Sequence, residues 1–143
     1  IASQYFDNIL GTTDSEVMFH LALSFGLDND VPAAIAKMVQ VVEATGKEKG
    51  VEPCLWMTLG ISDGETLWGF RYGSDGKGPT LYVSPNLADL KRLNPEVNER
   101  FGDFAACLVS EPIGDYQDSW RPIPENSKIV IRNKQIEQSN FHP

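Results

Sequence analysis

A change of hydrophobic period near residue 50 is the feature that most constrains the fold. Before it, apolar residues recur at the spacing of helices, and after it the segments "CLWMTLGI" (54–61) and "TLWGFRYG" (66–73) have the composition of strands. The short stretch "SDGE" between these segments is typical of a hairpin turn. Helices followed by antiparallel strands predict an α+β protein with a helix pair layered on a sheet.

The helical part divides into two elements at Gly26. Thr13 to Glu16 fits a capping box, in which the Thr13 hydroxyl accepts from a helical N–H and the Glu16 carboxylate reaches back. The helix that follows is apolar around most of its circumference, so we expect it to be covered on more than one side. Asp30 is suited to cap a second helix, which we expect to end at Gly46.

The rest of the chain reads as an antiparallel meander with a small helical insertion. The sequence predicts strands at 80–84 and 104–113, a short helix over Asn86–Leu93, and a final hairpin from "SKIVIRN" and "KQIEQSNF" (127–141). The segment at 54–61 is apolar on both faces, so its sheet should be covered on both sides. The predicted elements supply no obvious strands for that further layer, so we expect part of the structure to be missing.

Charge and composition exclude several classes of function. The net charge is −8 and the twelve basic residues are scattered, which disfavours nucleic-acid binding. No run approaches the roughly 18 apolar residues of a membrane span. Cys54 and Cys107 lie in apolar segments, as expected of buried thiols in a reducing compartment such as the cytoplasm. His20 and His142 are far apart, so we expect no metal site, and no cofactor motif is present.

Three stretches, taken in order, resemble the class II glutamine amidotransferases. They are "GTTDSEVMFHLALSFGL" (11–27), "SDGETLWGFRYGSDGKGPTLYVS" (62–84) and "SEPIGDYQDSWRPIPENS" (110–127). The pattern is most similar to the small stand-alone branch of that family. The resemblance implies the four-layer αββα sandwich of N-terminal-nucleophile hydrolases, with two antiparallel sheets between two helical layers.

The resemblance also implies a chemistry. Members hydrolyse the side-chain amide of glutamine through an N-terminal cysteine, whose own α-amino group acts as general base. An asparagine side chain and a glycine N–H stabilise the oxyanion, and ammonia leaves from a thioester intermediate. The implied ligand is a small molecule, glutamine or a γ-glutamyl compound. The ammonia would be released or passed to a separate partner protein.

The sequence departs from the family pattern at its beginning. Residue 1 is Ile, both cysteines are internal, and neither the "HNG" oxyanion segment nor the arginine for the substrate carboxylate has a match. We therefore expect residues 1–143 to be the C-terminal portion of a single glutamine amidotransferase type 2 domain, with the nucleophile segment absent. On this hypothesis the chain contains no catalytic residue. The alternative is a non-catalytic binding module or pseudoenzyme on the same scaffold.

One substrate-binding residue is implied by the resemblance. The Asp of the family's "TDSE"-type motif binds the α-amino group of glutamine, and that position here is Asp14. The positive end of a helix keeps an aspartate in its first turn ionised, which suits a carboxylate that binds an ammonium group. The alternative is that Asp14 only complements the helix dipole.

Three further polar residues fit structural roles better than chemical ones. Glu111, after a buried strand, could lie near a pocket but more simply bonds loop backbone. Arg71 alternates with aromatic residues and could stack, pair with an acid or contact substrate; we favour a structural role. His20 reads as a core or interface histidine. An incomplete domain should expose an apolar patch, from which we expect self-association, including a homo-oligomer.

Overall fold

The chain changes from helices to strands at residue 55. The computed structural model describes residues 1–84, 91, 105–113 and 117–143. It divides into a helical unit, Ile1–Leu55 with His142–Pro143, and a sheet unit, Trp56–Phe141. Helices followed by antiparallel strands confirm the predicted α+β class. The helix predicted over Asn86–Leu93 lies, apart from Lys91, outside the described residues.

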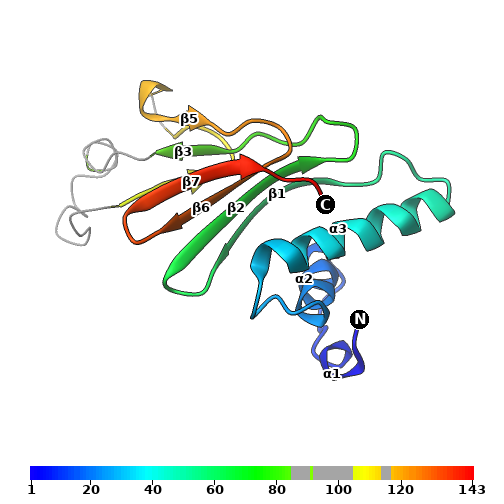
Figure 1. The fold of residues 1–143 in the computed structure, drawn as a ribbon. Coiled ribbons are helices and arrows are strands. Elements are labelled where there is room, and N and C mark those ends of the chain that lie inside the picture. The colour runs from blue at the N-terminus through cyan, green and yellow to red at the C-terminus, as the bar shows by residue number, and fades with distance from the viewer. Residues whose placement is uncertain (85–90, 92–104, 114–116) are drawn as a thin grey trace. The chain divides into compact units, whose positions relative to one another are not determined.

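The helical unit contains three helices, α1 (Ser3–Phe6), α2 (Asp14–Ser24) and α3 (Val31–Glu48) (Figure 1). Gly26, with a φ of 83°, ends α2 as predicted. There the N–H of Leu27 donates to the carbonyl of Ala22 over 3.2 Å, which is the bond of a Schellman motif.

The second helix is longer than predicted. Its expected stop, Gly46, lies inside α3, and the left-handed residue is Gly50, with a φ of 71°. A second Schellman bond joins Val51 N–H to the Gly46 carbonyl over 2.8 Å. Gly46 has another role, because a Cβ there would lie 2.6 Å from the sulfur of Cys54. The prediction of the helix end was wrong because a close tertiary approach, and not a turn, requires this glycine.

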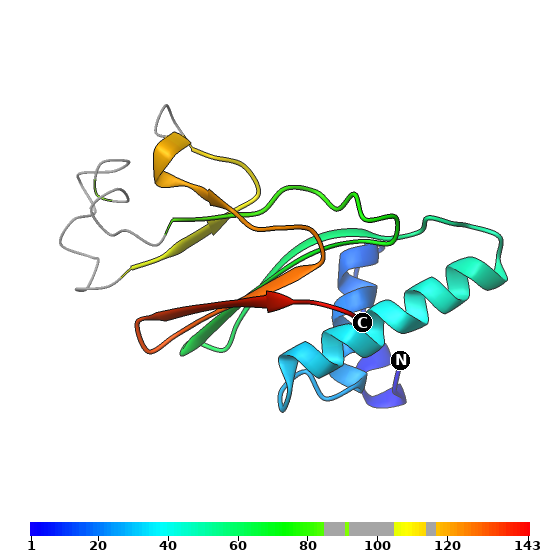
Figure 2. The ribbon, with the colours of Figure 1, turned by 45° about the horizontal axis from the view of Figure 1, so that its top comes forward.

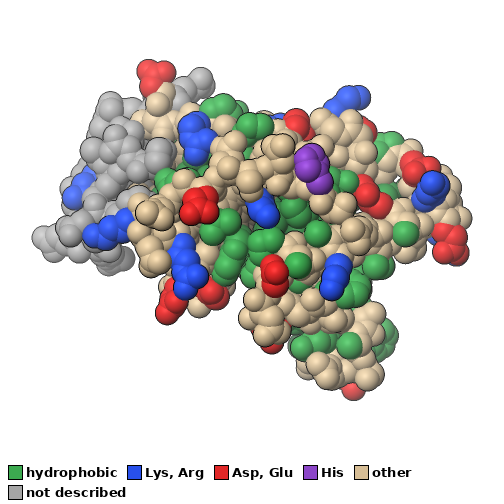
Figure 3. All heavy atoms as spheres, viewed as in Figure 1, with side chains coloured by type: hydrophobic (Ala, Val, Ile, Leu, Met, Phe, Trp, Pro, Cys, Tyr) green, Lys and Arg blue, Asp and Glu red, His purple; other side chains and the backbone are tan. Residues whose placement is uncertain are grey.

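Burial differs between the two main helices. On α3, Ile35, Met38 and Val39 are buried, as the periodicity predicts. On α2, by contrast, Val17 is 41% and Phe19 49% exposed, so these positions do not have the cover that we expected. Figure 3 shows apolar side chains at the surface of the lobe that α1 and α2 form. This apolar surface is consistent with the expectation of exposed patches.

The first sheet has four antiparallel strands in the order β1-β2-β6-β7. Two predicted hairpins build it. The first joins β1 (Trp56–Ser62) to β2 (Thr66–Gly73), and the second joins β6 (Ser127–Arg132) to β7 (Gln135–Asn140). The first hairpin meets the second through β2 and β6, strands that are distant in sequence (Figure 1).

The second sheet is made of three short antiparallel strands, β3 (Tyr82–Ser84), β4 (Cys107–Val109) and β5 (Arg121–Pro122), in the order β4-β3-β5. A 3₁₀ turn, η2 (Gln117–Ser119), precedes β5. Figures 1 and 2 show this sheet packed against a face of the four-stranded sheet. The chain thus supplies the extra layer that we thought was missing. Strands of two and three residues are too short to be recognised as a separate sheet from the sequence.

The core of the sheet unit lies between these two sheets. It is a cluster of buried aliphatic side chains: Leu81, Val83, Ile123, Ile129 and Ile131. A Cβ on Gly69 of β2 would lie 2.7 Å from Ile129 and 2.8 Å from Leu108, so the sheets approach closely there. On its other face, β2 places Phe70 and Tyr72 edge-on against the ring of Phe141. Both faces of β2 are therefore buried.

The β1–β2 turn depends on Asp63. Its Oδ1 accepts from Thr66 N–H over 2.7 Å and from Glu65 N–H over 2.9 Å, and Gly64 adopts a φ of 93°. These two N–H donors, Thr66 first, hold the pKa of the Asp63 carboxyl below its ordinary value of 3.8. The ionised form of Asp63 therefore favours the folded hairpin.

The lowered pKa of Asp63 predicts a pH dependence. Because the folded pKa lies below the unfolded value of 3.8, the contribution is present above pH 3.8 and is lost as the pH falls through the folded pKa. In an NMR titration, the Asp63 side-chain carbon should show a midpoint below 3.8. The Asp63→Asn variant should lose this part of the acid dependence of stability. A midpoint at or above 3.8 would show that the turn does not bind the ionised carboxylate.

Candidate functional site

The beginning of α2 gathers the polar groups of the "TTDSE" stretch. Thr13 is the N-cap, with extended backbone, and its Oγ1 accepts from Glu16 N–H over 3.4 Å. The Ser15 hydroxyl donates to the same oxygen over 3.3 Å. The Thr13 half of the capping box is therefore present.

Glu16 does not complete the capping box by bonding to Thr13 N–H. Its two carboxylate oxygens accept from Leu10 N–H over 2.9 Å and from Gly11 N–H over 2.8 Å. The preceding loop thus passes close to the Glu16 carboxylate, and a Cβ on Gly11 would collide with it. Both carboxylate oxygens of Glu16 therefore bind the loop that precedes the helix.

Asp14 is the first residue of α2 and is exposed. Its Oδ1 accepts from Ser15 N–H over 2.7 Å, and no other partner occurs among the described residues. A carboxylate at the N-terminus of a helix is stabilised as an anion by the helix dipole. The arrangement leaves Asp14 as the acid of this stretch that is available to a ligand. Its role in binding stays a prediction.

His20 and Cys54 have structural surroundings within the helical unit. His20 is 9% exposed, its Nδ1 lies 2.9 Å from the Glu16 carbonyl, and its ring meets that of Phe19 edge-on. The Nδ1 atom must carry the proton to donate this bond. Cys54 is half-buried, and its thiol donates to the Val42 carbonyl over 3.8 Å.

Arg71 is the most heavily bonded charged side chain of the described residues. Its Nε donates to the Pro79 carbonyl over 2.8 Å, and its Nη1 donates to the Ile123 carbonyl over 2.7 Å. Its Nη2 pairs with a Glu125 carboxylate oxygen at 2.6 Å and also reaches the Gly78 carbonyl. Arg71 therefore joins β2 to the loops before β3 and β6, the structural role that we favoured.

No sequence pattern singles out Glu125 as the partner of Arg71. Its second carboxylate oxygen accepts from Gly78 N–H over 2.9 Å, so Glu125 binds both Arg71 and the loop. The two residues are 54 positions apart in the sequence, so only the folded structure reveals this pair. Glu111, by comparison, lies exposed just beyond β4.

Cys107 lies on β4 and is half-buried. Burial raises the pKa of its thiol, so the reactive thiolate is disfavoured at neutral pH. This environment fits a packing residue better than a nucleophile.

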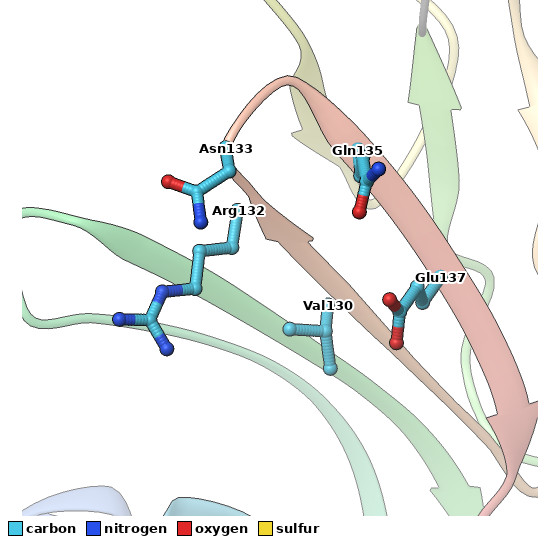
Figure 4. Close-up of a pocket in the computed structure, with 5 residues that line it drawn as sticks. All are labelled: Val130, Arg132, Asn133, Gln135 and Glu137. Atoms are coloured by element: carbon cyan, nitrogen blue, oxygen red, sulfur yellow. The ribbon is translucent and has the colours of Figure 1, made fainter.

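A hollow of about 290 Å³ lies on the hairpin of β6 and β7. Figure 4 shows its five lining side chains, which come from both strands and from the turn between them: Val130, Arg132, Asn133, Gln135 and Glu137. None of the residues that the sequence singled out lines it. The hollow is open and carries both an arginine and a glutamate, so it has no single preferred ligand charge.

Among residues 1–84, 91, 105–113 and 117–143, no three His, Cys, Asp or Glu side chains are grouped so that they could hold a metal ion. In the same ranges, no helix has the length and apolar character needed to cross a membrane.

These features define an α+β protein with two stacked antiparallel sheets and a helix that has polar residues at its N-terminus. No family model matches the sequence, and no curated protein matches it. Seven chains of solved structures do match. One is a glutamine aminotransferase class-II domain protein from Silicibacter pomeroyi, 29% identical, with a TM-score of 0.84. The match covers 100% of this chain and 58% of that chain.

This likeness shows that the chain has a class II glutamine amidotransferase-like fold. It agrees with the resemblance carried by the three sequence stretches. The chain spans 58% of the length of the neighbour that it matches. The activity, substrate and partners of a whole protein of this kind are therefore matters for proposal.

Proposed function

We propose that these 143 residues are the C-terminal part of a glutamine amidotransferase type 2 domain that releases ammonia from glutamine or from a γ-glutamyl amide. The observation that carries this proposal is the fold agreement over the full length of the chain, at a TM-score of 0.84. In this proposal the chain supplies part of the substrate pocket and the scaffold, and an upstream segment supplies the nucleophile.

The role proposed for Asp14 is to bind the α-ammonium group of the substrate. Three facts support it: the carboxylate is exposed, it lies at the positive end of α2, and it accepts a bond only from Ser15 N–H among the described residues. The neighbouring Glu16 is occupied by two backbone N–H groups and cannot share the task. A hydrogen bond between two ionised groups is stronger than a neutral one.

The reaction proposed for the whole domain is an acyl transfer in two steps. The upstream thiol loses its proton to its own α-amine and attacks the amide carbon, and ammonia leaves with the returned proton. Water then attacks the thioester, which yields a free γ-carboxylate and regenerates the thiol. Neither Cys54 nor Cys107 is the proposed nucleophile, because both are internal to the chain.

The small stand-alone branch is our proposal for the kind of amidotransferase. In this branch, simple hydrolysis or delivery of ammonia to a separate partner protein is as compatible with the fold as intramolecular channelling. We place the protein in the cytoplasm because both of its cysteines are free, as is usual in a reducing compartment.

Replacing Asp14 tests the proposed function. In the protein that includes its upstream segment, Asp14→Asn should raise the KM for glutamine by about 10- to 100-fold, because a charge-assisted bond contributes about 1.5–3 kcal/mol. The kcat should change less, since the ammonium group is remote from the reacting amide. The measurement is steady-state ammonia release from glutamine.

Two variants control this experiment. Asp28→Asn removes an exposed acid elsewhere in the helical unit and should leave the KM unchanged. Glu16→Gln should lower thermal stability, because the loop at the helix start loses its carboxylate acceptor. An unchanged KM in Asp14→Asn would remove the assigned role, and absence of glutamine hydrolysis in the unmodified protein would refute the function.

A further inference from the structure

The strand β1 has an edge position but the sequence of an interior strand. Among the described strands it is the outermost of its sheet, with β2 as its one neighbour. Its seven residues, "WMTLGIS", contain no charged side chain and no proline. Natural edge strands usually carry charges, prolines or bulges, which prevent other chains from pairing with them.

The opposite edge of the same sheet provides the comparison. There, β7 has the sequence "QIEQSN", in which five of six residues are polar or charged and all five are exposed. This is the composition expected of a strand that faces water along one side. The two edges of one sheet therefore differ in kind, and only β7 is protected against further pairing.

The register shows which β1 amides face the open edge. The Asp63 N–H donates to the Thr66 carbonyl, which closes the hairpin beside Ser62 and Leu67. Hydrogen-bonded and non-bonded pairs alternate along an antiparallel ladder. The N–H groups of Leu59 and Ile61 therefore point to β2. Those of Thr58, Gly60 and Ser62, which we call the outward amides, point away from it.

The solved neighbour is longer than this chain. It matches the whole of this chain, yet this chain accounts for only 58% of the neighbour's length. We propose that the open edge of β1 pairs with a strand from the rest of the amidotransferase-type domain. This inference rests on the proposed function, because it assumes that such a remainder exists. The paired strand would give β1 the interior position that its composition fits.

Hydrogen exchange measured residue by residue by NMR tests the pairing without any mutation. Two samples are compared, the 143-residue chain and the protein that includes its upstream segment. The outward amides should exchange rapidly in the shorter chain and about 100-fold or more slowly in the longer protein. The amides of Leu59 and Ile61 should be protected in both. By the same alternation along β6 and β7, the amides of Gln138 and Asn140 face the opposite open edge and should be protected in neither.

Two other results would contradict the proposed pairing of β1. Outward amides that stay fast in the longer protein would overturn the pairing. Protection in the short chain that disappears on dilution would also overturn it, and would show that a second copy occupies the edge. Ammonia release is measured on the same longer sample. Activity without β1 protection refutes only the pairing, whereas protection without activity refutes only the proposed function.

Discussion

Replacing Arg71 with methionine is expected to lower the free energy of unfolding by about 3 kcal/mol. This value is the lower end of the cost of removing one partner from a buried ion pair. The Arg71 side chain is 15% exposed and that of Glu125 37%, so water screens the pair only in part. Methionine keeps the apolar stem and removes every donor. It takes the guanidinium donor from the Ile123 carbonyl and leaves the Pro79 carbonyl with the Thr58 hydroxyl alone of the two donors. Chemical denaturation monitored by tryptophan fluorescence measures the loss.

Two other arginine variants define what the Arg71 result means. Arg132 pairs with Glu65 at 3.8 Å, with side chains 59% and 82% exposed, so Arg132→Met should change stability by less than about 1 kcal/mol. Arg71→Lys should fall between the two, because an ammonium keeps the charge but lacks the planar fork. A stability of Arg71→Met equal to that of Arg132→Met would show that the network contributes nothing beyond a surface ion pair.

Substitution of Gly78 by alanine should be the next most damaging change. A Cβ there would lie 2.6 Å from both the carbonyl carbon and the oxygen of Tyr72, which are backbone atoms of β2 and cannot rotate away. Gly78 also donates its N–H to Glu125, so displacing it would disturb the Arg71 network. We expect a loss at the upper end of the about 1–3 kcal/mol that overpacking costs.

The matched control for Gly78 is Gly60, on β1. A Cβ at Gly60 would meet no atom within 4 Å, so Gly60→Ala should keep or slightly raise stability, by up to about 1 kcal/mol through lower entropy of the unfolded chain. Thermal unfolding of both variants gives the comparison. Equal melting temperatures would mean that the loop at Gly78 relaxes freely, contrary to the rigid contact in the structure.

Features that depend on neighbouring residues were predictable. Thr13 and Asp30 cap their helices, Gly26 ends α2, and the hairpin turn at Asp63 forms where the sequence places it. In each case the partners lie within a few positions along the chain, so residue type alone fixes the hydrogen bond. The exposure of Asp14 beside a capping Thr13 follows from the same local geometry.

Features that depend on the path of another segment were not predictable. Glu16 was assigned to Thr13 N–H, but it binds the loop at Leu10 and Gly11, because the path of that loop brings two N–H donors nearer. The residue type of Gly46 predicts a helix stop, but in the structure this glycine makes room for Cys54. Each residue type permits both roles, so only the position of the other segment decides between them.

The sequence by itself determined the α+β class, the helix pair and the hairpins, because these depend on periodicity and turn chemistry. The tertiary structure alone decided that β3, β4 and β5 form a second sheet, and that Arg71 and Glu125 form one network. It also placed an uncharged β1 at a sheet edge. The physical reason is that strand order and ion pairing join segments far apart in the chain, and short-range patterns carry no record of such contacts.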